Sequence, residues 1–185
     1  MAPVPTSPYP DLPLDICGEI FTAVGRELRA ITALEPVVGN RIRECESIRA
    51  AIDQGFGTTD VPALLYAPGP QVQVRTANRG YSKLTTSVDI CLLTRCTDPF
   101  DTQDWLRPRI FHQIFLRLVR EEGTLRSGDG EEPDSGPDNR ITNAMTGFGQ
   151  IDPTGPIPKG NNIISTTCRV AFTSDIDEKT RLFIG

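Results

Sequence analysis

Hydrophobic residues recur at every third or fourth position in two long stretches, and this spacing predicts two amphipathic helices. The first starts at Leu14, where Asp11 or Asp15 can cap it, and ends at Pro36 with Gly39. Its apolar positions are Ile16, Ile20, Val24, Leu28, Ile31 and Leu34.

The second helix follows "DPFDTQDW" and ends at Gly123. Pro108 is tolerated only in a first turn, which favours a start near Asp104. The apolar stripe of this helix comprises Leu106, Ile110, Ile114 and Leu118, widened by Phe111 and Phe115.

Strict alternation of apolar and polar residues marks the strands. "QVQVRTA", residues 81–95 and "NNIISTTCRVAFTSD" follow this pattern. "PALLYA" is a short, continuously apolar strand, and "RLFIG" suits a short terminal strand. Asn78 and Gly80 supply turn chemistry, so we expect a long antiparallel hairpin that extends past the body of the domain. One face of residues 81–95 carries Leu84, Val88, Ile90 and Leu92; the other carries Lys83, Thr85, Ser87, Asp89, Cys91, Leu93 and Arg95.

The remaining segments define the domain plan. Residues 1–13 are proline-rich and are interpreted as an N-terminal arm. Residues 14–185 form the single α+β domain, with a mainly antiparallel sheet and a Gly/Pro-rich loop insertion at 124–160. "RIRECESIRAAIDQGFG" has helical spacing, with a short strand around Arg41 to Arg43 as the alternative.

Charge and composition exclude several classes of protein. The 185 residues carry a net charge of −5, which argues against a free-standing nucleic-acid binder. Five cysteines are an odd number and do not suit a closed disulfide framework. No segment resembles a signal peptide or a membrane span, so we expect a soluble protein without membrane partners.

Cys91, Cys96 and His112 are the candidates for metal or thiol chemistry. The two cysteines are five positions apart on a predicted strand, so their side chains point to opposite faces. A zinc site needs about four convergent ligands, and His112 is the only histidine. We therefore expect no catalytic residue, no metal and no cofactor, and hence no enzyme.

A cluster of basic and aromatic residues surrounds the predicted hairpin turn: Arg75, Arg79, Tyr81 and Lys83. Arginine and tyrosine are common interface anchors, so the hairpin tip is a candidate docking element for an acidic neighbour. The alternative is a charged tip that only contacts solvent.

The order of these parts resembles the tail-terminator (tail-completion) proteins of long-tailed bacteriophages. "ICGEIFTAVGRELRAITALEPVVGNRI" resembles the opening helix and turn of that family, and "SVDICLLTRCTDPFDTQDWLRPRIFHQIFLRLV" resembles its central strand, polar turn and helix. "NNIISTTCRVAF" resembles its closing strand. The resemblance covers residues 14–122 and 161–175; the arm and the 124–160 segment depart from it.

This resemblance implies a structural virion protein, located in the tail or at the head–tail junction and assembled in the host cytoplasm. It implies a homohexameric ring that caps the tail tube, contacts the tail-tube protein and the head-completion or neck protein, and lets DNA pass through its lumen without sequence-specific binding. Alternatives are another connector or tube protein of the same fold, an adaptor outside phage biology, or a ligand-binding or enzymatic domain closed by the 124–160 loop.

Overall fold

The computed structural model describes residues 16–55, 60–77, 81–95, 103–123, 125, 144–148, 157–159 and 163–177. Its helices are α1 (Ile16–Arg29), the 3-10 turn η1 (Thr32–Leu34), α2 (Glu35–Val38), α3 (Ile48–Asp53) and α4 (Gln103–Gly123). Its strands are β1 (Ile42–Glu44), β2 (Ala63–Ala77), β3 (Tyr81–Arg95), β4 (Ala144–Phe148), β5 (Ile157–Lys159) and β6 (Ile163–Asp177).

All of these strands belong to one sheet of order β1-β2-β3-β6-β4, with β5 also paired to β6. Only the β1–β2 pair is parallel; the others are antiparallel. β3 lies in the centre, pairing with β2 from Ala63↔Leu93 to Ala77↔Tyr81 and with β6 along its whole length. The expected fold class, a single domain of helices on a mainly antiparallel sheet, is therefore confirmed.

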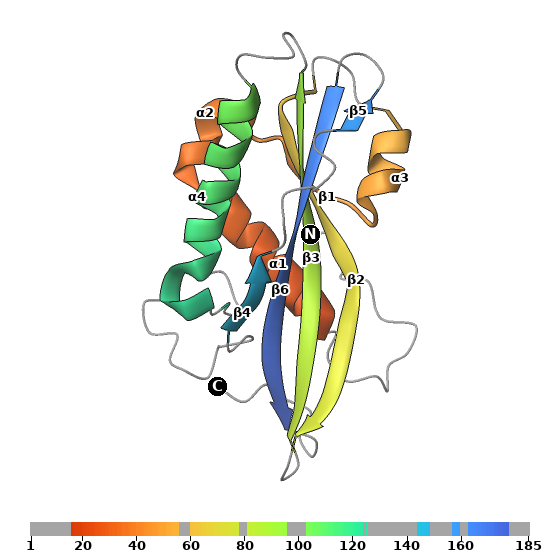
Figure 1. Ribbon diagram of the computed structural model, residues 1–185, viewed down its shortest axis with the longest axis vertical. Coiled ribbons are helices and arrows are strands. Elements are labelled where there is room, and N and C mark those ends of the chain that lie inside the picture. The colour runs from red at the N-terminus through yellow and green to blue at the C-terminus, as the bar shows by residue number, and fades with distance from the viewer. Residues whose placement is uncertain are drawn as a thin grey trace, which may run out of the picture.

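The two faces of the sheet are covered unequally (Figure 1). Helices α1, α2 and α4 lie on one face, and α3 lies on the other. The larger core joins α1 and α4 to Leu64, Val88, Ile90, Cys168 and Val170. A smaller core under α3 contains Val61, Leu65, Cys91, Leu93 and Ile163. The predicted two-faced pattern of residues 81–95 is confirmed, since alternate residues of β3 enter one core or the other.

Several helix boundaries differ from the prediction. The first helix ends at Arg29 rather than near Pro36, and η1 and α2 follow it up to Gly39, whose φ is 55°. Between Arg41 and Asp53 the chain forms the short strand β1 and the helix α3, so the alternative strand prediction is confirmed.

The long helix α4 begins at Gln103, which places Pro108 inside the helix and not in its first turn. The prediction for Pro108 was therefore wrong. Proline has no N–H to donate to the preceding turn, and the packing of Ile110, Phe111 and Ile114 in the core offsets that loss. Leu106 is in α4, but its side chain lies outside the described residues.

The segment 124–160 is not simply a loop, because β4 and β5 lie within it and pair with β6. The rest of that segment, except Leu125, lies outside the described residues, as do the 1–13 arm, the 78–80 turn and "RLFIG". Among the described helices, none is long and apolar enough to cross a membrane.

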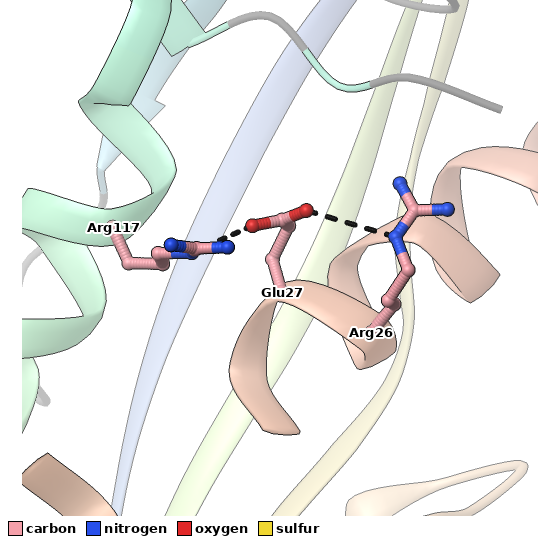
Figure 2. A network of polar contacts seen from close by, with 3 residues as sticks. All are labelled: Arg26, Glu27 and Arg117. Carbon is pink, nitrogen blue, oxygen red and sulfur yellow. Dashed lines mark hydrogen bonds and ion pairs between the residues drawn. The ribbon is translucent and has the colours of Figure 1, made fainter. Parts of the chain in front are cut away.

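Helices α1 and α4 are joined by an ion pair at the edge of the larger core (Figure 2). Arg117 Nε donates to Glu27 Oε2 at 2.7 Å, and Arg26 Nε lies 3.6 Å from Glu27 Oε1. The side chains of Arg117 and Glu27 are 27% and 24% exposed, so water screens this pair only in part. The pair fixes the relative position of two helices that also share apolar contacts.

Candidate interaction surface

Of the predicted interface residues, Arg75, Tyr81 and Lys83 lie at one end of β2 and β3, where these strands and β6 run beyond the helices (Figure 1). Arg75 and Lys83 are directly opposite each other in the strand register, and Lys83 is exposed. Arg79 and the side chains of Arg75 and Tyr81 lie outside the described residues.

Strand β6 adds acidic residues to this end of the sheet, which the sequence pattern did not indicate. Asp175 pairs in register with Lys83, and Asp177 pairs with Tyr81. The basic cluster is therefore flanked by carboxylates of its own chain, and its net positive charge is smaller than the local sequence implies.

Of the candidate thiol and metal residues, Cys91 and His112 do not meet. Cys91 is fully buried in the core under α3, His112 is exposed on α4, and Cys96 lies outside the described residues. Within the ranges that the structure describes, no group of three or more His, Cys, Asp or Glu side chains could hold a metal ion. Burial, and then the nearby charges of Asp89 and Cys91, raise the pKa of the Cys168 thiol far above its ordinary value.

The outer edge of β2 is only partly covered by a neighbouring strand. Strand β1 covers this edge only from Leu64 to Tyr66, although β2 continues to Ala77. In the part of the chain that the structure describes, no strand pairs with the remaining length of this edge. Such an edge presents unpaired backbone groups and is a template for strand addition.

The hydrogen bonds to β1 show which backbone groups point outward. Leu64 N donates to Arg41 O, and Tyr66 O accepts from Cys45 N, so the even-numbered residues of β2 face this edge. Pro68 pairs with Val88 of β3, and beyond the irregularity Val72 pairs with Thr86. Thr86 and Val88 are two residues apart in β3, so their backbone groups point in the same direction. By this alternation the N–H and C=O groups of Val72, Val74 and Thr76 also point outward.

Pro68 occupies an outward-facing position just where β1 ends. It offers a carbonyl but no N–H to a neighbouring strand, as does Pro70 within the irregularity. Gly69 lies between them because a Cβ there would be 2.9 Å from the carbonyl carbon of Ser87. This part of the edge therefore accepts hydrogen bonds, whereas residues 72–76 both donate and accept.

A cavity lies beside this edge on each face of the sheet. On the helix side, a cavity of about 720 Å³ is lined by α1, the end of β1 and β3, including Cys17, Phe21, Glu44 and Val88. On the opposite side, a cavity of about 650 Å³ is lined by α3, Ala67, Asp89 and Thr167. Both cavities are lined by Glu46 and Pro68, so they flank the same point of the edge.

Polar contacts hold the residues around the first cavity in place. Tyr66 Oη donates to Glu44 Oε2 at 3.3 Å and accepts from Arg29 Nη2 at 2.9 Å. Burial is the main cause that raises the pKa of the Tyr66 hydroxyl. Burial, and to a lesser extent the Glu44 carboxylate, raises the pKa of the Cys45 thiol.

Opposite charges also pair on the second face, next to the other cavity. Arg169 of β6 donates through Nε and Nη2 to Asp89 of β3, at 2.6 and 3.0 Å. These residues are directly opposite in the strand register, and the bidentate geometry raises the pKa of the Arg169 guanidinium. The sheet beside the edge is thus fixed on both faces by cross-strand contacts.

The periodicity of the sequence does not indicate this edge, although the sequence contains a signal for it. Two prolines in one strand, Pro68 and Pro70, are rare except in edge strands and bulges. "PALLYA" and "QVQVRTA" each look like a separate strand in the sequence. In the structure they form one strand of 15 residues, with the prolines inside it.

In comparisons with known proteins, no family model and no curated protein matches this chain.

Proposed function

We propose that this protein is a structural subunit that assembles into a ring, acting as a tail terminator that caps a phage tail tube and joins it to the head. The observation that supports this proposal best is the outer edge of β2 from Val72 to Thr76, which no described strand of the chain covers. A neighbouring copy that adds a strand there would bury these backbone groups.

Such a contact is heterologous, because a strand on one copy meets a different surface on the next. Heterologous contacts produce a closed ring when their rotation closes, and an open filament when it does not. The sequence resemblance favours a closed hexamer around a lumen wide enough for DNA. The end of the sheet that carries Arg75, Tyr81 and Lys83 extends beyond the helices and is a second surface for docking to tube or neck proteins, to which the predicted residue Arg79 would contribute.

The ring proposal is tested by blocking the edge without disturbing the fold. In Val74→Pro, the lost N–H is one that points away from β3, so the β2–β3 pairing remains intact. We expect this variant to keep its circular dichroism spectrum and to sediment as a monomer where the wild-type chain forms rings.

Two control variants make the result specific. Val74→Ala keeps the backbone N–H and should assemble normally. Gln73→Pro removes an N–H that faces β3, and should lower the melting temperature. Rings of unchanged size from Val74→Pro would remove this edge from the assembly mechanism.

A tube subunit or a head-completion subunit of the same fold would share these features. Purified tails that lack a terminator, and purified heads, separate these roles. A terminator should bind the tails and stop tube growth, whereas a head-completion subunit should bind heads first.

A further inference from the structure

The edge of β2 and its two flanking cavities define what kind of strand can bind there. A strand laid along this edge would alternate its side chains between the two faces of the sheet. One set would enter the 720 Å³ cavity on the helix side, and the other would enter the 650 Å³ cavity under α3. The first cavity is mainly apolar, whereas the second also has polar and charged residues in its lining, among them Glu46, Asp89 and Thr167. The occupant therefore needs an apolar face toward the first cavity and a face that combines apolar and basic groups toward the second.

The backbone of the edge adds a second requirement. At Pro68 the edge offers a carbonyl without an N–H, so the occupant must donate its own N–H groups there. In addition, Glu44 and Glu46 lie at the rim of the first cavity, and Glu46 also lines the second. A basic residue next to the apolar residues would complement these carboxylates.

One segment of this chain meets these requirements. We propose that residues 181–185, "RLFIG", of one copy add as a strand to the β2 edge of a second copy. Leu182 and Ile184 share one face of such a strand and Phe183 occupies the other, with no proline among them. Arg181 supplies the basic residue. In the proposed ring, this segment is the strand that one copy donates to the next. The inference rests on the proposed function only because it takes a second copy of the chain as the partner.

The length of the chain excludes binding of this segment to its own cavities. Asp177, the last residue of β6, lies at the level of Ala77, whereas the cavities lie at the level of Pro68. Pro68 is opposite Val88, seven residues from Tyr81 along β3, or about 24 Å, and the outer edge of β2 is roughly 14 Å from β6. Phe183 is six residues beyond Asp177 and so reaches about 20 Å at most, well short of the combined distance of roughly 28 Å.

The proline-rich residues 1–13 are the competing occupant within this chain, because α1 begins beside the first cavity with Cys17 and Gly18 in its lining. In the register that leaves Ser7, Tyr9 and Asp11 as donors, one face of that segment would be polar and the other would be two prolines. Two prolines would fill less of the first cavity than Leu182 and Ile184, and Asp11 would repel Glu46 where Arg181 would pair with it, so 181–185 is the better match.

The test uses a fluorescent peptide of residues 178–185 and the full chain carrying Phe183→Asp, which cannot donate its own strand. Fluorescence anisotropy should show saturable binding. Val72 faces outward and pairs with Thr86 of the first cavity's lining. Adding Val72→Pro to the acceptor should weaken binding by about tenfold or more, as expected for a lost hydrogen bond with a steric clash, while Val72→Ala should leave it nearly unchanged.

The remaining outcomes are also decisive. Failure of the peptide to bind, or equal binding to the Val72→Pro acceptor, would overturn the proposal. Displacement of the peptide by one of residues 1–15 at equal concentration would overturn it in favour of the N-terminal segment. If the Phe183→Asp chain still forms rings, the assignment of 181–185 as the donated strand fails and the ring function stands. If the peptide binds but the wild-type chain forms no ring, the strand addition stands and the ring function fails.

Discussion

Gly25 lies on α1 where the helix packs directly on Tyr66, so the substitution Gly25→Ala tests how tightly the helix and sheet are fitted. An added Cβ would lie 2.6 Å from Tyr66 Cζ and 2.8 Å from Cε2, and closer still to the hydroxyl oxygen. Tyr66 is only 1% exposed and cannot swing into solvent. Its ring also contacts Phe21 at 4.9 Å between centroids, and its hydroxyl bonds Arg29 and Glu44.

Two opposing effects decide whether Gly25→Ala raises or lowers the free energy of unfolding. Replacing glycine by alanine inside a helix stabilises it by about 0.8–1.0 kcal/mol. Overpacking a tight core costs about 1–3 kcal/mol, and displacing the hydroxyl weakens hydrogen bonds worth roughly 1 kcal/mol each. The clash outweighs the helix propensity, so we expect a net loss of about 1–3 kcal/mol in the free energy of unfolding. In a chain of this size that lowers the melting temperature by about 2–12 °C.

Thermal and urea unfolding of the wild type and the variant measure this loss. Thr22→Ala, at an exposed position of the same helix, is the matched control and should change stability by only a few tenths of a kcal/mol. In the double variant Gly25→Ala/Tyr66→Phe, the Tyr66 hydroxyl that the new Cβ would approach most closely is absent. Its loss of unfolding free energy should therefore be smaller than the sum of the losses in the two single variants. A melting temperature equal to or above that of the wild type in Gly25→Ala would refute the packing described for α1 and β2.

Three further predictions concern other contacts. Arg117→Met leaves Glu27 without its 2.7 Å partner between α1 and α4, and should cost about 1 kcal/mol in urea unfolding, less at high salt; an unchanged midpoint would contradict it. Gly69→Ala forces the β2 irregularity away from the Ser87 backbone, so it should lower the melting temperature and weaken binding of the 178–185 peptide. Because burial raises the pKa of the Cys168 thiol above 9.0, the folded chain keeps a proton that the unfolded chain loses, so stability should fall as pH rises above about 9; a flat stability profile from pH 8 to 10 would contradict this.

Local periodicity predicted the elements that depend on one buried face. The stripe Ile110, Ile114 and Leu118 identified α4, and the alternation of β3 identified both of its faces. These predictions succeeded because burial repeats with the geometry of the helix or strand itself.

Features set by distant residues could not be read in this way. The end of the first helix at Arg29, the strands β4 and β5, and the acids of β6 beside Lys83 all depend on which segments meet in the fold. The candidate site was equally hidden, because an uncovered edge is defined by where β1 stops relative to β2. The two prolines of β2 are the one sequence signal that indicates an edge strand there.

The central claim is that copies of this chain assemble into a closed ring through the β2 edge. Native mass spectrometry across a concentration series, with negative-stain images of the concentrated sample, tests it most directly. The account predicts one closed oligomer, six copies by the resemblance, seen as rings with a central hole. A strictly monomeric mass at every concentration, with no ring in the images, would contradict it.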